Sequence, residues 1–199
     1  MSWLLFIPAC FALNMAPGPN NITAFATGAR LGFWPGFLAA LGRLPAFAFL
    51  ITLTAIGLGA ALTASAVAFT VIKYVGAAYL VYVGFHMLRA RVDTTDMPAA
   101  QDIRSLMRRD FLIAITNPKA IAIFTAVFPQ FLDLSQPAAP QFVWIGGTFL
   151  CLETVAIAIY VAAGTLLSGV INQTAIGGAL NKAVGGFLVF SGAALVLGH

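Results

Sequence analysis

Six apolar segments, each long enough to cross a lipid bilayer as a helix, take up most of this 199-residue chain. A spanning helix needs about 20 predominantly apolar residues. An open sheet cannot satisfy its backbone in lipid, and these runs lack the alternating strands of a β-barrel, so all six are predicted to be helices. Their approximate limits are Ser2–Ala29, Phe37–Leu62, Val67–Leu88, Phe111–Leu132, Phe142–Leu167 and Ile176–Leu197.

The composition excludes several classes of protein. Hydrophobic residues make up 61% of the chain and charged residues only 8%, whereas a soluble domain is about 25% charged. Ten dispersed basic residues do not form a nucleic-acid-binding stripe. No P-loop, HExxH or G-x-S-x-G motif occurs, and the isolated cysteines and histidines do not make a metal site. We therefore expect an integral membrane protein that is not an enzyme and needs no cofactor, metal or nucleic acid.

One hydrophilic segment divides the chain. Nine of the sixteen charged residues of the chain lie between Arg89 and Asp110, five of them basic and four acidic. This predicts a first three-helix unit at residues 1–89, a linker at 90–109 and a second unit at 110–199. Basic residues in short loops stay in the cytoplasm. The first, third and fifth loops carry the basic residues Arg30, this cluster and Lys182, so we expect a cytoplasmic linker and both termini outside.

The two units resemble each other weakly. The glycine-rich run from Lys73 to Gly84 in the third segment matches the run from Lys182 to Gly192 in the sixth. At an offset of 110, Pro8 also aligns with Pro118. Three spans are an odd number, so the second unit enters the membrane from the opposite side. Inverted repeats of this kind are common in secondary transporters, although duplication for packing alone would leave the same pattern.

The first apolar segment is interrupted by Pro17-Gly18-Pro19-Asn20-Asn21. Two prolines remove backbone donors and clash with the preceding turn, so the helix is predicted to break here. Asn20 is predicted to cap the helix that restarts. Such a helix start presents free N–H groups and a positive dipole end, which suit a carboxylate. A plain proline kink is the alternative.

The fourth segment is predicted to break at Asn117-Pro118-Lys119, after a short lead-in helix over 110–116. Asn at the N-cap followed by Pro at the first helical position is a good helix-start signal. A lysine within the membrane needs a partner or a purpose, unless its side chain reaches the headgroups. The predicted orientation places both breaks in the inner half of the membrane, where they could face each other.

Two further charges lie within apolar segments. Glu153 is at the centre of the fifth segment and Arg43 is about one third into the second. Glu153 could pair with Lys119 or Arg43, or could carry a coupling proton. A purely structural ion pair is the alternative. Together with the residues at the two breaks, these two charged residues make up the candidate binding site. Its members are Pro17, Gly18, Pro19, Asn20, Asn21, Arg43, Asn117, Pro118, Lys119 and Glu153.

Taken in order, the motifs resemble the lysine exporter (LysE/RhtB) family of bacterial amino-acid efflux proteins over essentially the whole chain. The resemblance rests on Pro17-Gly18-Pro19-Asn20, the run from Lys73 to Gly84, Asn117-Pro118-Lys119 and Pro129-Gln130-Phe131. It implies about six transmembrane helices in the bacterial plasma (inner) membrane and export of amino acids or close derivatives by the proton-motive force. Arg43 departs from the small or neutral residue expected near the start of the second segment.

We therefore expect an all-α secondary transporter built from two inverted three-helix repeats, with broken first and fourth helices. Its partners would be a small amino-acid substrate and the lipid bilayer, and the oligomeric state stays open, a homodimer included. The alternatives are a non-transporting membrane scaffold or subunit and a cation or metal efflux protein of related fold. A transporter requires Asn20, Lys119 and Glu153 to face one polar cavity, whereas a scaffold would leave them dispersed.

Overall fold

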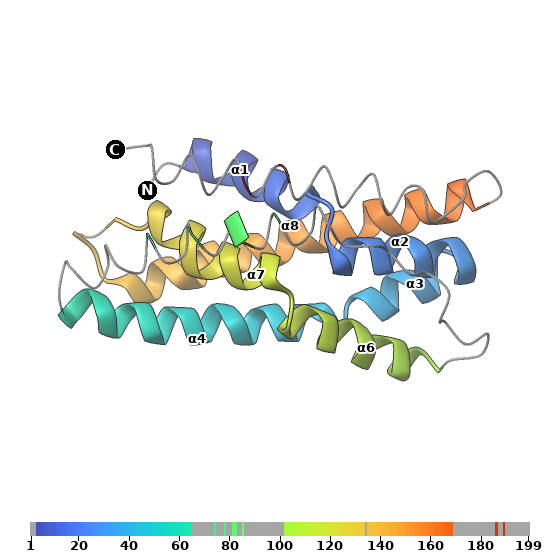
Figure 1. Ribbon diagram of the computed structural model, residues 1–199, viewed down its shortest axis with the longest axis horizontal. Coiled ribbons are helices and arrows are strands. Elements are labelled where there is room, and N and C mark those ends of the chain that lie inside the picture. Colours follow the sequence, from blue (N-terminus) through green and yellow to red (C-terminus); the bar gives the residue numbers. More distant parts are fainter. Residues whose placement is uncertain are drawn as a thin grey trace.

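The computed structural model describes residues 3–64, 74, 78, 81–82, 85, 102–133, 135–168, 186 and 189, without the side chains of residues 3–4 and 58–64. All regular structure in these ranges is helical, which confirms the predicted fold class. The helices run mostly along the long axis of the molecule (Figure 1). They are α1 (Trp3–Met15), α2 (Pro19–Leu31), α3 (Phe33–Ala40), α4 (Arg43–Ala64), α6 (Ile103–Ile115), α7 (Pro118–Ala122), η1 (Ile123–Val127), η2 (Phe128–Phe131) and α8 (Ala138–Leu167).

Two helical stretches in the described ranges, Phe33–Gly57 and Ala138–Leu167, are long and apolar enough to cross a membrane. Ile103–Ile115 with Pro118–Phe131 makes a third if this pair, bent by 47°, is one span. The predicted third and sixth spans, and the repeat motifs beginning at Lys73 and Lys182, lie outside the described residues apart from isolated positions. The repeat and the count of six spans therefore stay predictions.

The predicted break in the first segment is present. α1 ends at Met15 and α2 begins at Pro19, with residues 16–18 between them. Gly18, in an extended conformation, is the N-cap of α2, and Pro19 occupies the first helical position. The prediction that Asn20 caps this helix was wrong. Proline is favoured at the first helical position, so the cap falls one residue before Pro19 and the Asn20 side chain is free to contact other helices.

The fourth segment also breaks as predicted. Asn117 caps α7, with its side-chain oxygen accepting a hydrogen bond from the Lys119 N–H at 3.0 Å. The lead-in helix α6 is longer than predicted, because it begins at Ile103, inside the range assigned to the linker. Beyond α7, η1 is a π-helix and η2 a 3-10 helix. Pro129 removes a backbone donor at this point, so a regular α-helix cannot continue through it.

A third interruption separates α3 from α4, within the segment predicted to be one continuous helix. Leu41 and Gly42 form a turn, and α4 begins at Arg43. Pro45 has no N–H to donate, which is tolerated in the first turn of a helix but not in its interior. The three interruptions lie near the middle of the long axis (Figure 1). Each interruption therefore places polar or charged residues of a helix start inside the molecule.

Unbroken helix α8 packs against α1, α2, α3 and α4. Its contact with α2 is close enough to exclude a side chain on either helix. A Cβ atom added to Gly28 would lie 2.4 Å from the Val161 carbonyl oxygen, and one added to Gly164 would lie 2.0 Å from the Phe25 carbonyl oxygen. Such small-residue contacts let membrane helices approach backbone to backbone. α8 therefore holds Glu153 at a fixed position beside the broken helices.

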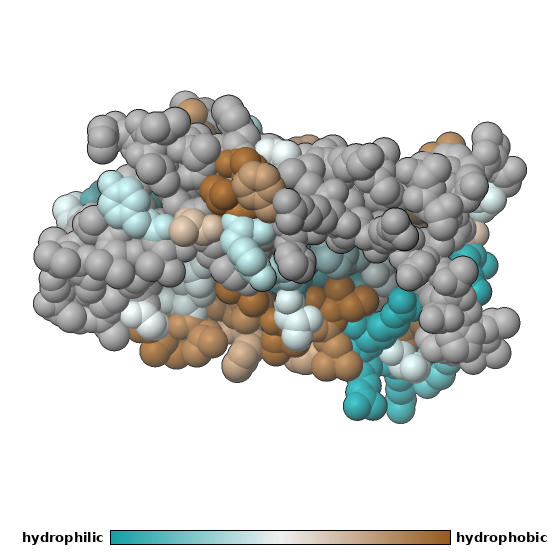
Figure 2. All heavy atoms as spheres, in the orientation of Figure 1, coloured by the Kyte–Doolittle hydropathy of each residue, from teal (hydrophilic) through white to brown (hydrophobic). Residues whose placement is uncertain are grey.

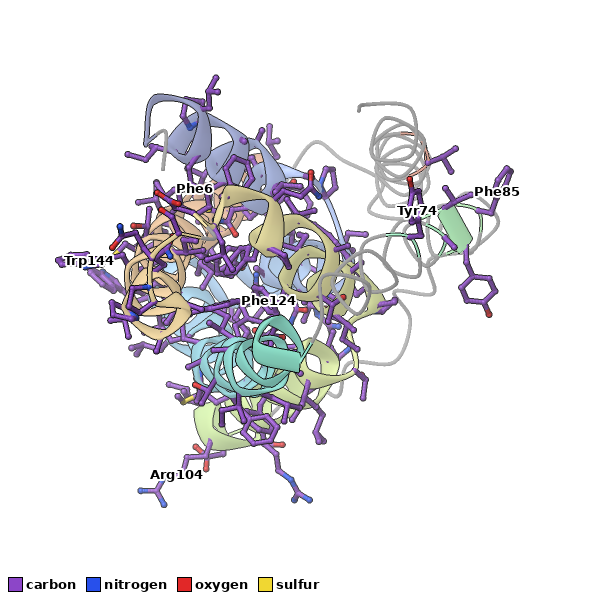
Figure 3. The ribbon with its side chains drawn as sticks, turned by 90° about the vertical axis from the view of Figure 1, so that its left-hand side faces the viewer. Phe6, Tyr74, Phe85, Arg104, Phe124 and Trp144 are labelled. Carbon is purple, nitrogen blue, oxygen red and sulfur yellow. The ribbon has the colours of Figure 1, made fainter. Side chains whose placement is uncertain are left out.

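Aromatic side chains from α4, η1 and α8 form a core next to the breaks. The Phe124 and Phe149 rings meet edge to face, with centroids 4.9 Å apart, and Phe47 contacts both. Phe124 points inward, whereas Trp144 and Arg104 point away from the helices (Figure 3). Hydrophobic side chains cover the visible face of α4, and hydrophilic ones gather near the charged start of α6 (Figure 2). This distribution suits helices surrounded by lipid, with a polar end at one membrane surface.

Candidate functional site

Arg43 is the centre of a buried polar cluster. Its side chain is 0% exposed, and every one of its N–H groups has a partner. Nε donates to Asp110 Oδ2 at 2.8 Å, and Nη1 donates to Glu153 Oε1 at 3.0 Å. The remaining donors bond Asn21 Oδ1, the Asn20 carbonyl and Asp110 Oδ1. Arg43 therefore ties the start of α4 to α2, α6 and α8 and has no donor to spare.

The two carboxylates beside Arg43 are almost as deeply buried, with side-chain exposures of 3% for Asp110 and 5% for Glu153. Buried charges need ionic and hydrogen-bonding partners, because desolvation of an unpaired ion is costly. Of the pairings left open by the sequence, the structure shows Glu153 with Arg43. Asp110 was counted only as the edge of the linker, so sequence reasoning missed its pairing. The unpaired Arg43 in an apolar segment was the signal that such a carboxylate was needed.

Asparagine side chains join the two predicted breaks. Asn117 Nδ2 donates to Asn20 Oδ1 at 2.8 Å, and Asn20 Nδ2 donates to the Asp110 carbonyl at 3.1 Å. Both asparagines are buried. The broken ends of the first and fourth segments therefore face each other, as predicted, and an amide-to-amide hydrogen bond fixes their distance.

Lys119 lies between the breaks. Its side chain is buried, and Nζ donates to the Ala16 carbonyl just beyond the end of α1. That carbonyl has no partner within the helix, because the last carbonyls of a helix lack donors. The lysine has found the partner that its burial requires, and it remains inside the molecule instead of extending to a membrane surface. An ammonium group carries three N–H donors, so one bond to Ala16 leaves two for a ligand.

Two other side chains satisfy carbonyls at the end of α1. Asn21 Nδ2 donates to the Asn14 carbonyl at 2.8 Å, and the Tyr160 hydroxyl donates to the Met15 carbonyl at 2.7 Å. The end of α1 is thus held by α2 and α8 as well as by Lys119. The unwound segment is consequently a defined structure and not merely a kink.

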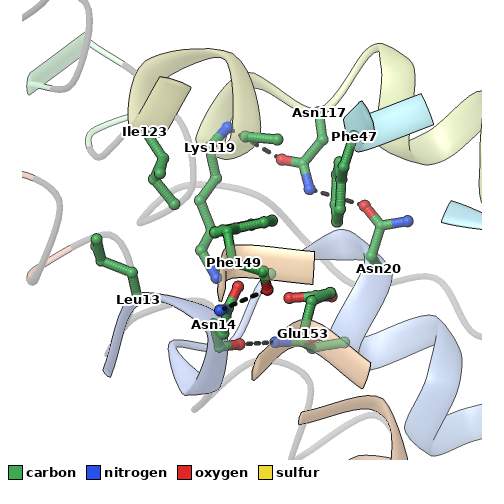
Figure 4. A pocket seen from close by; sticks show the side chains of 12 residues that line it. Leu13, Asn14, Asn20, Phe47, Asn117, Lys119, Ile123, Phe149 and Glu153 are labelled. Carbon is green, nitrogen blue, oxygen red and sulfur yellow. Dashed lines mark hydrogen bonds between the residues drawn. The ribbon is translucent and has the colours of Figure 1, made fainter. Parts of the chain in front are cut away.

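These groups surround a pocket between α1, α2, α7 and α8 (Figure 4). Its polar side contains amide, ammonium and carboxylate groups, and its other side contains aliphatic and aromatic ones. About 290 Å³ of space lies between the lining atoms, but most of it is crevice, with room for about one water molecule. The lining residues are Leu13, Asn14, Gly18, Asn20, Asn21, Phe47, Asn117, Lys119, Ala120, Ile123, Phe149 and Glu153.

The structure therefore brings six predicted site residues into one pocket: Gly18, Asn20, Asn21, Asn117, Lys119 and Glu153. The other four lie around it. Pro17, Pro19 and Pro118 belong to the helix breaks, and Arg43 lies behind the lining in contact with Asn21 and Glu153. Asn14 was missed, because a single asparagine in an apolar run gives no sign of the face on which it lies. In the described ranges, His, Cys, Asp and Glu form no group of three that could hold a metal.

A second, smaller pocket lies on the other side of the ion pairs. It is lined by Thr23 and Thr27 of α2, Arg109 and Asp110 of α6, and residues of α3. Asp110 lines this pocket and Glu153 lines the first, and Arg43 joins the two carboxylates. The buried network of Arg43, Asp110 and Glu153 thus connects the linings of the two pockets.

Comparison with known proteins agrees with this architecture. The LysE type translocator family matches residues 11–199. An uncharacterized membrane protein of Vibrio cholerae is 32% identical, with 98% of this chain and 95% of that protein covered. The homoserine/homoserine lactone efflux protein of Salmonella typhi is 28% identical over 97% and 95% of the two chains. The leucine efflux protein of an Enterobacter species is 30% identical over 77% and 72%. No solved structure matches.

Proposed function

Because the chain belongs to the LysE type translocator family, and so is a membrane translocator and not an enzyme, we propose that it exports amino acids or close derivatives from the cytoplasm. Relatives named for efflux of homoserine, homoserine lactone and leucine support this substrate class. All three compounds are small and carry an amino group beside a carboxyl or lactone carbonyl. The proposal places the protein in the bacterial inner membrane as a secondary transporter with six spans and inverted repeats.

The observation that carries the proposal is the meeting of two helix breaks at one pocket of mixed charge. The pocket is lined by the ammonium of Lys119 and the carboxylate of Glu153, which come from different helices. A small zwitterion offers the complementary pair of charges. Discontinuous helices whose ends surround a central site are a recurrent feature of secondary transporters. Convergence of Asn20, Lys119 and Glu153 also counts against a scaffold, in which these residues would be dispersed.

In the proposed complex the substrate carboxylate lies between Lys119 and the start of α2. Pro19 has no N–H, so the free backbone donors of this first turn belong to Asn20 and Asn21. The positive end of the α2 dipole adds to the attraction for an anion. The substrate ammonium lies toward Glu153, and an apolar substrate side chain would lie against Phe47 and Phe149.

Proton coupling forms part of the proposal. Glu153 lines the pocket and is paired through one oxygen with Arg43. The Glu153 carboxylate can pair with Arg43, with the ammonium group of a bound substrate, or with a proton. Glu153 is therefore the group that we assign to the coupling proton.

Export assays on a Lys119→Ala variant test the proposal. Cells that lack their own exporters are loaded with amino acid as a dipeptide, and the efflux rate is measured at equal protein expression. We expect Lys119→Ala to abolish efflux, because the carboxylate loses its cationic partner. Arg104→Ala is the matched control, since Arg104 is exposed, does not line the pocket and points away from the helices (Figure 3). Full efflux by Lys119→Ala would remove Lys119 from the mechanism.

A further inference from the structure

Most polar atoms of the pocket are already bonded within the protein. Three of its four asparagines have both ends of the side-chain amide engaged. Asn20 and Asn117 bond each other, with further bonds to Asp110 and to the Lys119 N–H. Asn21 accepts from Arg43 and donates to the Asn14 carbonyl. These three amides hold helices together, so ligand recognition must use other atoms.

Asn14 is the exception among the four. The residue is 2% exposed, and its Oδ1 is the one buried side-chain nitrogen or oxygen atom in the described ranges that lacks a hydrogen-bond partner. Leaving a buried acceptor unpaired is unfavourable, which makes such atoms rare in folded proteins. Asn14 is one of the residues that line the pocket (Figure 4), and a ligand bound there is the partner that we consider for the unpaired oxygen.

The orientation of the Asn14 amide follows from its neighbours. Nδ2 donates to the Phe149 carbonyl at 3.4 Å and lies 3.7 Å from Cys10 Sγ. Turning the amide over would place its oxygen against the Phe149 oxygen, so two acceptors would face each other. The free atom is therefore an acceptor, and its missing partner is a donor.

A second acceptor is available at the same pocket. Glu153 Oε1 accepts from Arg43, whereas Oε2 makes no hydrogen bond within the described part of the chain. Asn14 comes from α1 and Glu153 from α8, and both line the cavity. The negative end of the α1 dipole lies in the same place, since Asn14 is in the last turn of that helix. Two free acceptors, one of them on a carboxylate, beside a helix C-terminus favour a cation with several N–H groups.

We propose that Asn14 Oδ1 accepts a hydrogen bond from the substrate ammonium, with Glu153 supplying the opposite charge. This inference rests on the proposed function and adds a residue that selects the substrate. Compounds that keep the carboxylate but lack the amino group would leave Asn14 Oδ1 unpaired, so they are rejected. The unpaired oxygen at the pocket is then the acceptor that the substrate satisfies.

Competition in proteoliposomes tests this role. Uptake of radiolabelled L-leucine or L-homoserine, whichever the protein carries, is measured against unlabelled amino acid and against its analogue without the amino group. We expect the protein to prefer the amino acid strongly and Asn14→Leu to reduce that preference at least about tenfold, through KM more than kcat. Thr154→Val is the control, because the Thr154 hydroxyl bonds only the Leu150 carbonyl of its own helix.

Asn14→Gln keeps both the amide N–H donor that bonds the Phe149 carbonyl and the acceptor oxygen, so it retains most of the preference and provides a second test if Asn14→Leu does not fold. An unchanged preference in Asn14→Leu, or complete loss of the preference in Asn14→Gln, overturns the inference while transport continues. Failure of the unmodified protein to carry any amino acid instead overturns the proposed function. The two failures are therefore distinguishable.

Discussion

At the scale of single residues, Arg43 shows how a charge becomes tolerable inside an apolar protein. A guanidinium offers five donors in a planar fork, and here the five reach acceptors on four residues of three helices, namely Asn20, Asn21, Asp110 and Glu153. Lysine has three donors on one atom and cannot span the same partners. The site therefore requires arginine in particular, and not merely a positive charge.

Arg43→Lys should lower stability by about 3 kcal/mol, because one of the two buried carboxylates loses its partner. Thermal unfolding in detergent, followed by circular dichroism, measures the effect. Arg108→Lys, a change of the same kind at an exposed position on α6, should leave the unfolding temperature unchanged. Equal unfolding temperatures for the two variants would show that the buried network contributes little.

Sequence reasoning at this scale succeeded where one residue type has one strong preference. Asn117 before Pro118 predicted the cap that the structure shows. It failed where the partner depends on the three-dimensional arrangement. Asp110 and Asn14 are unremarkable in the sequence, and only the packing of α1, α6 and α8 places them in the buried polar cluster. Asn20 was assigned as a cap because its neighbour Pro19 was treated only as a breaker.

At the scale of helices, the breaks determine where polar groups can lie. α2, α4 and α7 each begin near the middle of the molecule, and each brings a polar or charged residue there within its first turn (Figure 1). The starts of α2 and α7 were predicted from their prolines, Pro19 and Pro118. The α3–α4 turn was missed, because Gly42 and Pro45 are separated by two residues and neither alone is a strong stop signal. The π-helix η1 also went unpredicted, since hydrophobic periodicity does not report hydrogen-bond register.

The contact of α8 with α2 yields a test with a matched control on the same helix. Gly164→Ala should destabilise the protein by about 1–3 kcal/mol or more, because the new methyl group would meet the Phe25 backbone and force the helices apart. Gly147→Ala should be neutral or slightly stabilising, since nothing lies within 4 Å of its Cβ position. Unfolding in detergent compares the two. Similar effects would mean that helix propensity, and not the close contact, governs these positions.

At the scale of the whole molecule, the ion pairs of Arg43 connect the linings of the two pockets, since Glu153 lines the first and Asp110 the second. The first pocket holds about one water molecule in this conformation, so an amino acid can enter only when the lining helices separate. This arrangement could not be predicted from the sequence, because it depends on the relative positions of helices from both predicted repeats.

We predict the orientation of the protein in the membrane from the distribution of charge at its two ends. The start of α6 and the start of α8 lie at opposite ends of the molecule (Figure 1). Arg104, Arg108 and Arg109 lie at the first end, whereas Asp133 is the charged side chain of the described ranges near the second. There, Ser135 donates to the Asp133 carboxylate from its hydroxyl and its N–H, which lowers the pKa of that group and keeps it ionised. Basic ends stay in the cytoplasm, so the α6 start should face inward.

Single cysteines at Ser105 and Gln136, both exposed, test this orientation in a background without Cys10 and Cys151. A membrane-impermeant maleimide applied to intact spheroplasts should label Gln136→Cys. It should label Ser105→Cys only after the membrane is permeabilised, because that end lies in the cytoplasm. The opposite pattern would show that the protein has the reverse orientation. The helix breaks, which we predict to lie in the inner half of the membrane, would then lie in its outer half. Labelling of both cysteines in intact spheroplasts would show that the bent α6–α7 pair does not cross the membrane and instead returns to the same side.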